Sequence, residues 1–140
     1  MVLYPSQEWC DEWKKLINAD EAILKTGAKW GVSFNGDWLF VITPGGGLEE
    51  TAYVFLAASA GRCSEARMLS DPEEVEPGFV VTGTYPDYRS VVQGEKDFLA
   101  LVVKGVFKVK GDMLKIMQNA KFIRAVANSI SRIDSEFLGD

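Results

Sequence analysis

"GVFKVKGDMLKIM", residues 105–117, is the stretch from which the fold can be read most directly. In "VFKVK" apolar residues alternate with lysines, and this period of two predicts a short strand with Phe107 and Val109 on one face and the lysines outward. A glycine then breaks the alternation, and Asp112 stands where its carboxylate can cap a helix that begins at Met113. The stretch therefore predicts a strand that turns directly into a helix.

Two glycines among lysines also invite comparison with a phosphate-binding loop. A P-loop requires Lys-Ser/Thr after its second glycine, because the hydroxyl holds magnesium while backbone N–H groups cradle phosphate. Here Asp112 follows Gly111 instead, and it occupies the helix N-terminus where a phosphate would sit. We therefore expect no nucleotide site in this stretch.

Outward from this stretch, the hydrophobic period changes from helical to alternating and back again. Ser6 and Asp20 are placed to cap the first two helices, and Asn35-Gly36-Asp37 is a hairpin signal. Helices, then a meander of about five strands, then helices predict one α+β domain over residues 1–140, with a five-stranded, mainly antiparallel sheet covered on one face by helices. The predicted helices cover residues 7–18, 21–27, 86–94, 95–105, 113 onward and 120–133; the predicted strands lie within 28–34, 38–43, 51–59, 64–69, 79–85 and 106–110.

The composition is that of a globular protein and excludes several classes of function. With 47% hydrophobic and 25% charged residues, the chain can bury a sizeable core. No apolar run reaches the roughly 18 residues that a membrane span needs. The N-terminus does not resemble a secretory signal, and two cysteines form no disulfide framework, so we expect a cytoplasmic protein. Histidine is absent, which removes imidazole catalysis and the commonest zinc ligand, and no metal or cofactor site is expected.

Charge is unevenly distributed along the chain. The net charge is −5, yet residues 104–132 hold seven Lys and Arg against Asp112 alone. Such a segment can form a surface for anionic partners such as lipid headgroups, and a solvated helix face is the alternative. The overall acidity and the lack of basic residues interleaved with the aromatic residues of the predicted sheet argue against nucleic acid as a partner.

Candidate catalytic groups are few. The paired carboxylates Glu49-Glu50 and Glu73-Glu74 lie in predicted loops and are expected to be solvated, whereas a general acid requires burial or a close partner. Cys10 has acidic neighbours and no base, and Cys63 has only Arg62 beside it, so neither thiol is expected to be an activated nucleophile. We expect no catalytic residues and no enzymatic activity.

Large, soft apolar side chains are concentrated near the C-terminus. Methionine and phenylalanine recur from residue 98 to residue 137, and methionine adapts to irregular apolar shapes. In the predicted helix over 120–133, apolar residues share one arc opposite Lys121 and Arg132. Such a set fits either a packed core or the lining of a pocket for an apolar ligand.

Residues 91–126, "VVQGEKDFLALVVKGVFKVKGDMLKIMQNAKFIRAV", resemble the signature half of the sterol carrier protein 2 (non-specific lipid-transfer protein) family. Members carry a polar-Gly segment, a helix, Gly, an apolar/basic strand, Gly-Asp and a helix. The match is most specific over residues 78–126, and the order of elements upstream agrees with it. The matching positions are Gly94, Phe98, Gly105, Lys108, Lys110, Gly111, Asp112 and Met113.

The resemblance implies helices that cover an apolar tunnel, which holds fatty acids, acyl-CoA, sterols or other lipids without covalent chemistry. The leading hypothesis is therefore a lipid-binding or carrier protein in which the helix over 120–133 acts as a lid. Lys115, Lys121 and Arg124 are then expected to meet an anionic headgroup, and transient contact with an anionic membrane is expected as well. The residues expected to line the tunnel are Phe40, Phe55, Phe98, Leu101, Val102, Phe107, Met113, Met117, Phe122, Val126 and Ile130.

The alternative is an interaction module of the same fold that forms a homodimer and holds no lipid. An exposed aromatic face on the first helix, with Trp9 and Trp13, would supply its surface. An enzyme is the third hypothesis, and it has the least support because the chain offers no pair of a nucleophile and a base.

Overall fold

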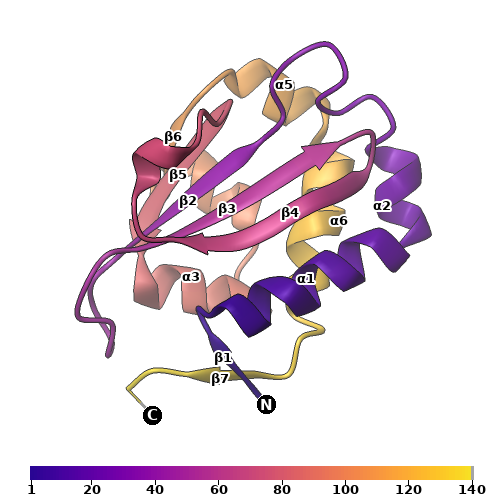
Figure 1. The fold of residues 1–140 in the computed structure, drawn as a ribbon. Coiled ribbons are helices and arrows are strands. Elements are labelled where there is room, and N and C mark those ends of the chain that lie inside the picture. Colours follow the sequence, from indigo (N-terminus) through magenta and orange to yellow (C-terminus); the bar gives the residue numbers. More distant parts are fainter. Residues whose placement is uncertain (140) are drawn as a thin grey trace.

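The computed structural model describes residues 1–139, which form an α+β structure around a five-stranded mixed sheet (Figure 1). The strand order is β4-β3-β2-β5-β6, and β1 and β7 form a separate pair. In chain order the elements are β1 (Val2–Tyr4), α1 (Gln7–Ala19), α2 (Glu21–Thr26), β2 (Trp38–Thr43), β3 (Ala52–Ser59), β4 (Arg62–Leu69), the 3₁₀ turn η1 (Pro72–Glu74), β5 (Phe79–Thr84), α3 (Tyr85–Val92), α4 (Phe98–Val103), β6 (Lys108–Lys110), α5 (Met113–Gln118), α6 (Ala120–Ile130) and β7 (Ser135–Phe137).

The sheet is mixed because the connection from β4 to β5 carries the chain back across the sheet to the free side of β2. β2, β3 and β4 pair antiparallel in succession, and β5 then pairs parallel to β2, with Trp38 opposite Phe79. β6 adds an antiparallel edge, with Val81 opposite Val109. The expected five-stranded, mainly antiparallel sheet is confirmed, but it is not a simple meander.

Alternation along the strands divides the sheet into two unlike faces. The inner face carries Trp38, Ile42 and Leu56 and belongs to the main core, together with the buried faces of the helices. The outer face carries a smaller cluster of Leu39, Phe55, Ala57 and Leu69, against which Val75 of the segment after β4 packs. The prediction that helices cover one face is therefore confirmed.

The prediction of a strand within residues 28–34 is wrong. Residues 27–34 are turns, in which Trp30 is fully buried while Val32 is 65% exposed. Trp30 lies against Trp38, with ring centroids 5.6 Å apart, and its indole N–H donates to the Gly36 carbonyl at 2.9 Å. The Asn35 side chain donates to the Glu76 carbonyl at 2.7 Å, so it bonds to the crossing segment rather than closing a hairpin.

The three predicted helix caps are confirmed, but the helix predicted from residue 95 begins only at Phe98. Ser6 accepts from the Trp9 N–H at 3.0 Å, Asp20 from the Ile23 N–H at 3.1 Å, and Asp112 from the Leu114 N–H at 2.9 Å. These bonds satisfy donors that the first turn of a helix leaves unpaired. The last helix ends at Ile130, three residues earlier than predicted, and the chain then continues to β7.

The two ends of the described chain lie side by side, as Figure 1 shows at the bottom of the molecule. β1 and β7 pair parallel, with Val2 opposite Ser135 and Tyr4 opposite Phe137. Neither strand was predicted, because "VLY" and "SEF" do not lie in a longer alternating stretch of the kind that marked β6. Within residues 1–139, the helices are all too short or too polar to cross a bilayer.

Candidate lipid-binding cavity

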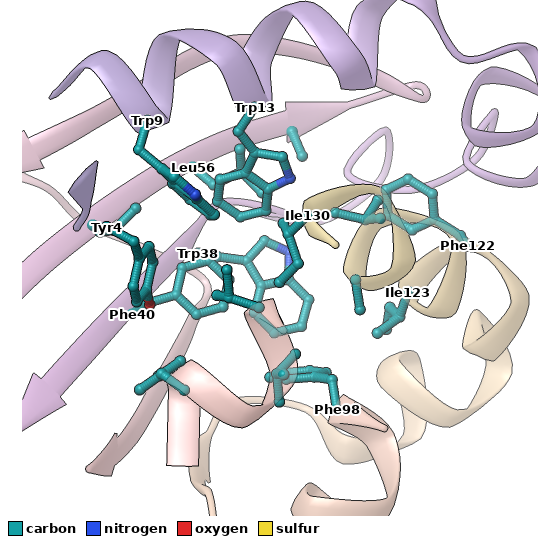
Figure 2. A pocket seen from close by; sticks show the side chains of 17 residues that line it. Tyr4, Trp9, Trp13, Trp38, Phe40, Leu56, Phe98, Phe122, Ile123 and Ile130 are labelled. Atoms are coloured by element: carbon teal, nitrogen blue, oxygen red, sulfur yellow. The ribbon is translucent and has the colours of Figure 1, made fainter. Parts of the chain in front are cut away.

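An apolar cavity of about 70 Å³ lies between the inner face of the sheet and the helices (Figure 2). Its wall contains no Lys, Arg, Asp or Glu among the described residues. It is lined by Tyr4, Trp9, Trp13, Trp38, Phe40, Val54, Leu56, Ala58, Tyr88, Val91, Val92, Phe98, Phe122, Ile123, Val126, Ala127 and Ile130.

The sheet contributes the floor of the cavity. Trp38 and Phe40 alternate on β2, and their rings stack with centroids 5.8 Å apart. Val54, Leu56 and Ala58 alternate in the same way on β3. Because a strand sends alternate side chains to one face, these five residues share the inner surface.

Helix α6 contributes the opposite wall. Phe122, Ile123, Val126, Ala127 and Ile130 fall at the i, i+1, i+4, i+5 and i+8 spacing of one helical face. The face of α6 that is turned to the sheet is thus apolar along its length. The N-terminus of α6 has no side-chain cap.

Gly27 allows the α2–α6 contact. A Cβ atom at position 27 would lie 2.5 Å from the Phe122 ring, so a larger residue would push this ring away from α2. The position of Phe122 in the cavity wall therefore depends on a glycine at the end of α2.

Aromatic rings from α1 and β1 close one end of the cavity. The Trp9 ring centroid lies 4.7 Å from that of Tyr4 and 5.3 Å from that of Trp13. Trp13 in turn lies 5.9 Å from Phe40 on the floor. Figure 2 shows these rings gathered on one side and α6 on the other.

Two polar side-chain atoms of the wall are bonded to the protein. The Tyr88 hydroxyl donates to the Val81 carbonyl at 2.7 Å, and the Trp9 indole N–H donates to the Ser135 hydroxyl at 3.0 Å. Burial raises the pKa values of the Tyr4 and Tyr88 hydroxyls well above the usual value for tyrosine, so both are neutral at physiological pH. The wall is uncharged.

A polar depression of about 160 Å³ adjoins the cavity. It shares Val91, Phe98 and Ala127 with the cavity wall. Its remaining lining residues are Gly94, Glu95, Lys96, Asp97, Asn128 and Ser131, which come from the loop between α3 and α4 and from the end of α6.

The predicted lining residues fall into three groups. Five of them, Phe40, Phe98, Phe122, Val126 and Ile130, line the cavity. Leu101, Val102 and Phe107 are buried in the same core but do not reach the cavity wall. Phe55 lies on the other face of the sheet, and Met113 and Met117 are 37% and 49% exposed.

Two differences from the sequence prediction have simple physical causes. β3 is apolar on both faces, so alternation cannot tell which face Phe55 joins. On α5 the buried residue is Ile116, and a helix of six residues is too short for its period to show which of its other apolar residues are covered.

The most important residues that the sequence reasoning missed are on α1. Trp9 and Trp13 were expected on an exposed face for dimerisation, but they are 2% and 5% exposed and line the cavity. This expectation is wrong, because the apolar face of α1 packs on the protein's own core. The homodimer alternative thereby loses the surface on which it rested.

The other candidate groups lie away from the cavity. Glu49, Glu50 and Glu73 are exposed, and Glu74 lies 3.6 Å from the Arg67 guanidinium. Cys10 and Cys63 are free, buried thiols.

Burial has the largest effect on the two thiols, and it raises the pKa of Cys10 to about 12 and that of Cys63 to about 11. Both thiols are therefore protonated near neutral pH, as the sequence led us to expect of unactivated cysteines.

Comparison with known proteins gives a likeness of structure only. No family model matches the sequence, and no curated protein matches it. A crystal structure of sterol carrier protein 2 matches with a TM-score of 0.80 and 19% identity, over 91% of this chain and 97% of the other.

Two further structures agree with this result. A conserved hypothetical protein from Thermus thermophilus matches with a TM-score of 0.73 and 21% identity, over 89% and 87% of the two chains. The apo form of sterol carrier protein 2 from Yarrowia lipolytica matches with a TM-score of 0.53 and 15% identity, over 91% and 87%. The chain therefore has the fold of sterol carrier protein 2, which confirms at the level of structure the resemblance carried by residues 78–126.

Proposed function

We propose that this chain acts as one domain that binds an apolar ligand, such as a fatty acid, an acyl-CoA, a sterol-like molecule or another lipid, without covalent chemistry. The observation that carries the proposal is the uncharged, aromatic-rich cavity between α6 and the inner face of the sheet. Affinity would come from burial of hydrocarbon, at about 0.8 kcal/mol per CH₂ group. A ten-carbon segment would then contribute roughly 8 kcal/mol before the losses of association.

The cavity must enlarge to hold such a ligand. Its volume of about 70 Å³ is well below the roughly 300–1,000 Å³ of most small-molecule sites. Helix α6 is the element most suited to move, because few polar contacts hold it. Arg124 lies 3.8 Å from Asp97, and Arg132, just beyond the helix, lies 2.8 Å from Asp20. Surface ion pairs of this kind contribute little to stability, so α6 can act as a lid.

Energy transfer from tryptophan to parinaric acid, a fluorescent fatty acid, tests the proposal. Three of the four tryptophans line the cavity, so a bound polyene would lie next to them. We expect saturable transfer with a micromolar dissociation constant, reversed by unlabelled fatty acid. Transfer that does not saturate, or that unlabelled fatty acid does not reverse, would count against a specific site.

We further propose that α5 contacts an anionic membrane surface. Met113, Leu114 and Met117 are 37%, 64% and 49% exposed on a helix whose buried residue is Ile116. Exposed apolar side chains beside lysines are typical of helices that lie in the membrane interface. The nearby exposed lysines are Lys104, Lys108, Lys110 and Lys121.

The position of α5 connects this surface to the lid. Asn119 ends α5 and directly precedes α6, and its side chain donates to the Lys115 carbonyl at 2.8 Å. Contact of α5 with lipid would therefore act on the first turn of α6. This arrangement supports transfer between a membrane and the cavity, in addition to storage.

A further inference from the structure

The indole nitrogen of Trp13 is a fully buried polar atom of the cavity wall that has no partner within residues 1–139. The Trp13 side chain lines the cavity and is 5% exposed, and its indole Nε1–H makes no hydrogen bond within residues 1–139. Figure 2 shows this nitrogen on the edge of the ring turned toward Ile130 of α6. The unpaired donor thus faces the helix that must move for a ligand to enter.

Other tryptophans in the same core show how a buried indole is normally satisfied. Trp9 donates to the Ser135 hydroxyl at 3.0 Å, and Trp30 donates to the Gly36 carbonyl at 2.9 Å. A buried donor without an acceptor destabilises the folded state, so it requires an explanation. Phenylalanine would fill the apolar space at position 13 without this penalty.

We propose that Trp13 Nε1–H is the polar contact that orients the ligand, and that the ligand is a neutral, mostly hydrocarbon molecule with a carbonyl or hydroxyl oxygen. This inference rests on the proposed function and narrows it. When α6 moves outward, Ile130 leaves the indole edge and the ligand oxygen accepts the hydrogen bond in its place. The bond would be strong for its kind because water is excluded around it.

The charges around the cavity favour a neutral ligand over an anion. The wall holds no Lys or Arg. At the surface, Arg124 of the lid pairs with Asp97 and Arg132 pairs with Asp20, while Lys121 of the lid is exposed to solvent. The adjoining polar depression holds two acids, Glu95 and Asp97, against Lys96. A carboxylate at the depth of Trp13 would therefore be buried without a countercharge, which is strongly unfavourable, so a fatty acid such as parinaric acid would have to keep its carboxylate outside the cavity.

A matched pair of probes isolates the proposed hydrogen bond. Butyrophenone and butylbenzene have nearly the same shape, but only butyrophenone carries a carbonyl oxygen. Their dissociation constants are measured by calorimetry for the wild type, Trp13→Phe and Trp9→Phe. The loss of ring volume in a variant affects the binding of both probes alike. The change in butyrophenone affinity divided by the change in butylbenzene affinity therefore reports only the hydrogen bond to the carbonyl oxygen.

We expect Trp13→Phe to weaken butyrophenone binding about tenfold more than butylbenzene binding, which is the size of one buried hydrogen bond. Trp9→Phe should change both affinities by the same factor, because the Trp9 N–H already has an acceptor in Ser135. An equal loss for the two probes in Trp13→Phe would overturn the assignment of Trp13 while leaving the binding function intact. If the wild type binds neither probe, this inference fails, whereas the proposed function fails only if parinaric acid also shows no saturable energy transfer.

Indole N–H resonances give a second test that requires no variant. In the wild type, butyrophenone should shift the Trp13 indole proton downfield, as a new hydrogen bond does, and butylbenzene should not. Equal shifts with both probes would contradict a hydrogen bond to the ligand.

Discussion

Tyr85, the first residue of α3, donates its hydroxyl hydrogen to the backbone carbonyl of Tyr4 at 3.2 Å. The same hydroxyl accepts the Leu138 backbone N–H at 2.9 Å. One fully buried side chain thus joins the start and the end of the described chain to the helix that follows the sheet. This end of the molecule also holds Tyr4 and Trp9, which close the cavity.

Tyr85→Phe should therefore lower the free energy of unfolding by about 1–3 kcal/mol, because it leaves a buried carbonyl and a partly buried N–H without this partner. Urea unfolding measures the effect, with an unchanged m-value indicating that the unfolded state is the same. Tyr53→Phe, on the half-buried outer face of β3, is the control and should change stability by less than about 0.5 kcal/mol. An equally small effect of Tyr85→Phe would show that these bonds do not hold the ends of the chain.

Ala127→Leu should fill the cavity from α6, so binding and stability are expected to change in opposite directions. Affinity for parinaric acid should fall at least about tenfold, while stability stays the same or rises by about 0.5–2 kcal/mol, as cavity-filling substitutions do. Lys121→Leu introduces the same side chain on the exposed side of the same helix and should leave affinity unchanged. A large loss of stability in Ala127→Leu would indicate that the space is already filled.

The double variant Leu114→Glu/Met117→Glu should weaken binding to anionic vesicles, because it replaces exposed apolar contacts with charges that anionic lipid repels. We expect a loss of about tenfold or more in vesicle co-sedimentation at low salt. Leu3→Glu alters an exposed apolar residue on β1, at the opposite end of the molecule in Figure 1, and should have little effect. If both changes act equally, membrane contact is not specific to α5.

The raised pKa of Cys10, about 12, predicts a loss of stability at high pH. Between pH 9 and 12 the thiol ionises in the unfolded chain but stays protonated in the folded chain. The contribution of this thiol to the free energy of unfolding is therefore fully present below pH 9 and declines as the pH rises. Unfolding measured from about pH 7 to 10 should show a smaller loss in Cys10→Ala than in the wild type. Identical pH slopes would contradict burial of the thiol as the cause.

The same burial predicts low chemical reactivity. At about pH 8, Cys10 and Cys63 should react with a disulfide reagent far more slowly in the folded chain than in urea, because both thiols are protonated and covered. Rapid reaction of either thiol in the folded chain would mean that this part of the core opens readily.

The sequence predicted best where local rules decide the structure. The turn from β6 into α5 depends on a glycine and on the Asp112 cap, and both are local. The inward face of α6 follows from its period, so Phe122, Val126 and Ile130 were correctly expected on the side that faces the sheet. In each case the neighbours in sequence supply the information.

Prediction failed where a distant contact decides the structure. Trp9 and Trp13 mark an apolar helix face, but periodicity does not reveal whether a face is covered by its own chain or by a second one. Trp30 lies in a pattern that alternates like a strand, yet its burial against Trp38 and Phe79 requires a turn. These contacts depend on segments that are brought together only in the folded chain.

Native mass spectrometry tests most directly whether the cavity is a lipid site. The wild type and Ala127→Leu are purified, extracted with organic solvent, and then incubated with a mixed lipid extract. We predict that the wild type acquires a one-to-one adduct with a lipid mass and that Ala127→Leu does not. The absence of any adduct on the wild type, or equal adducts on both proteins, would contradict a ligand bound between α6 and the sheet.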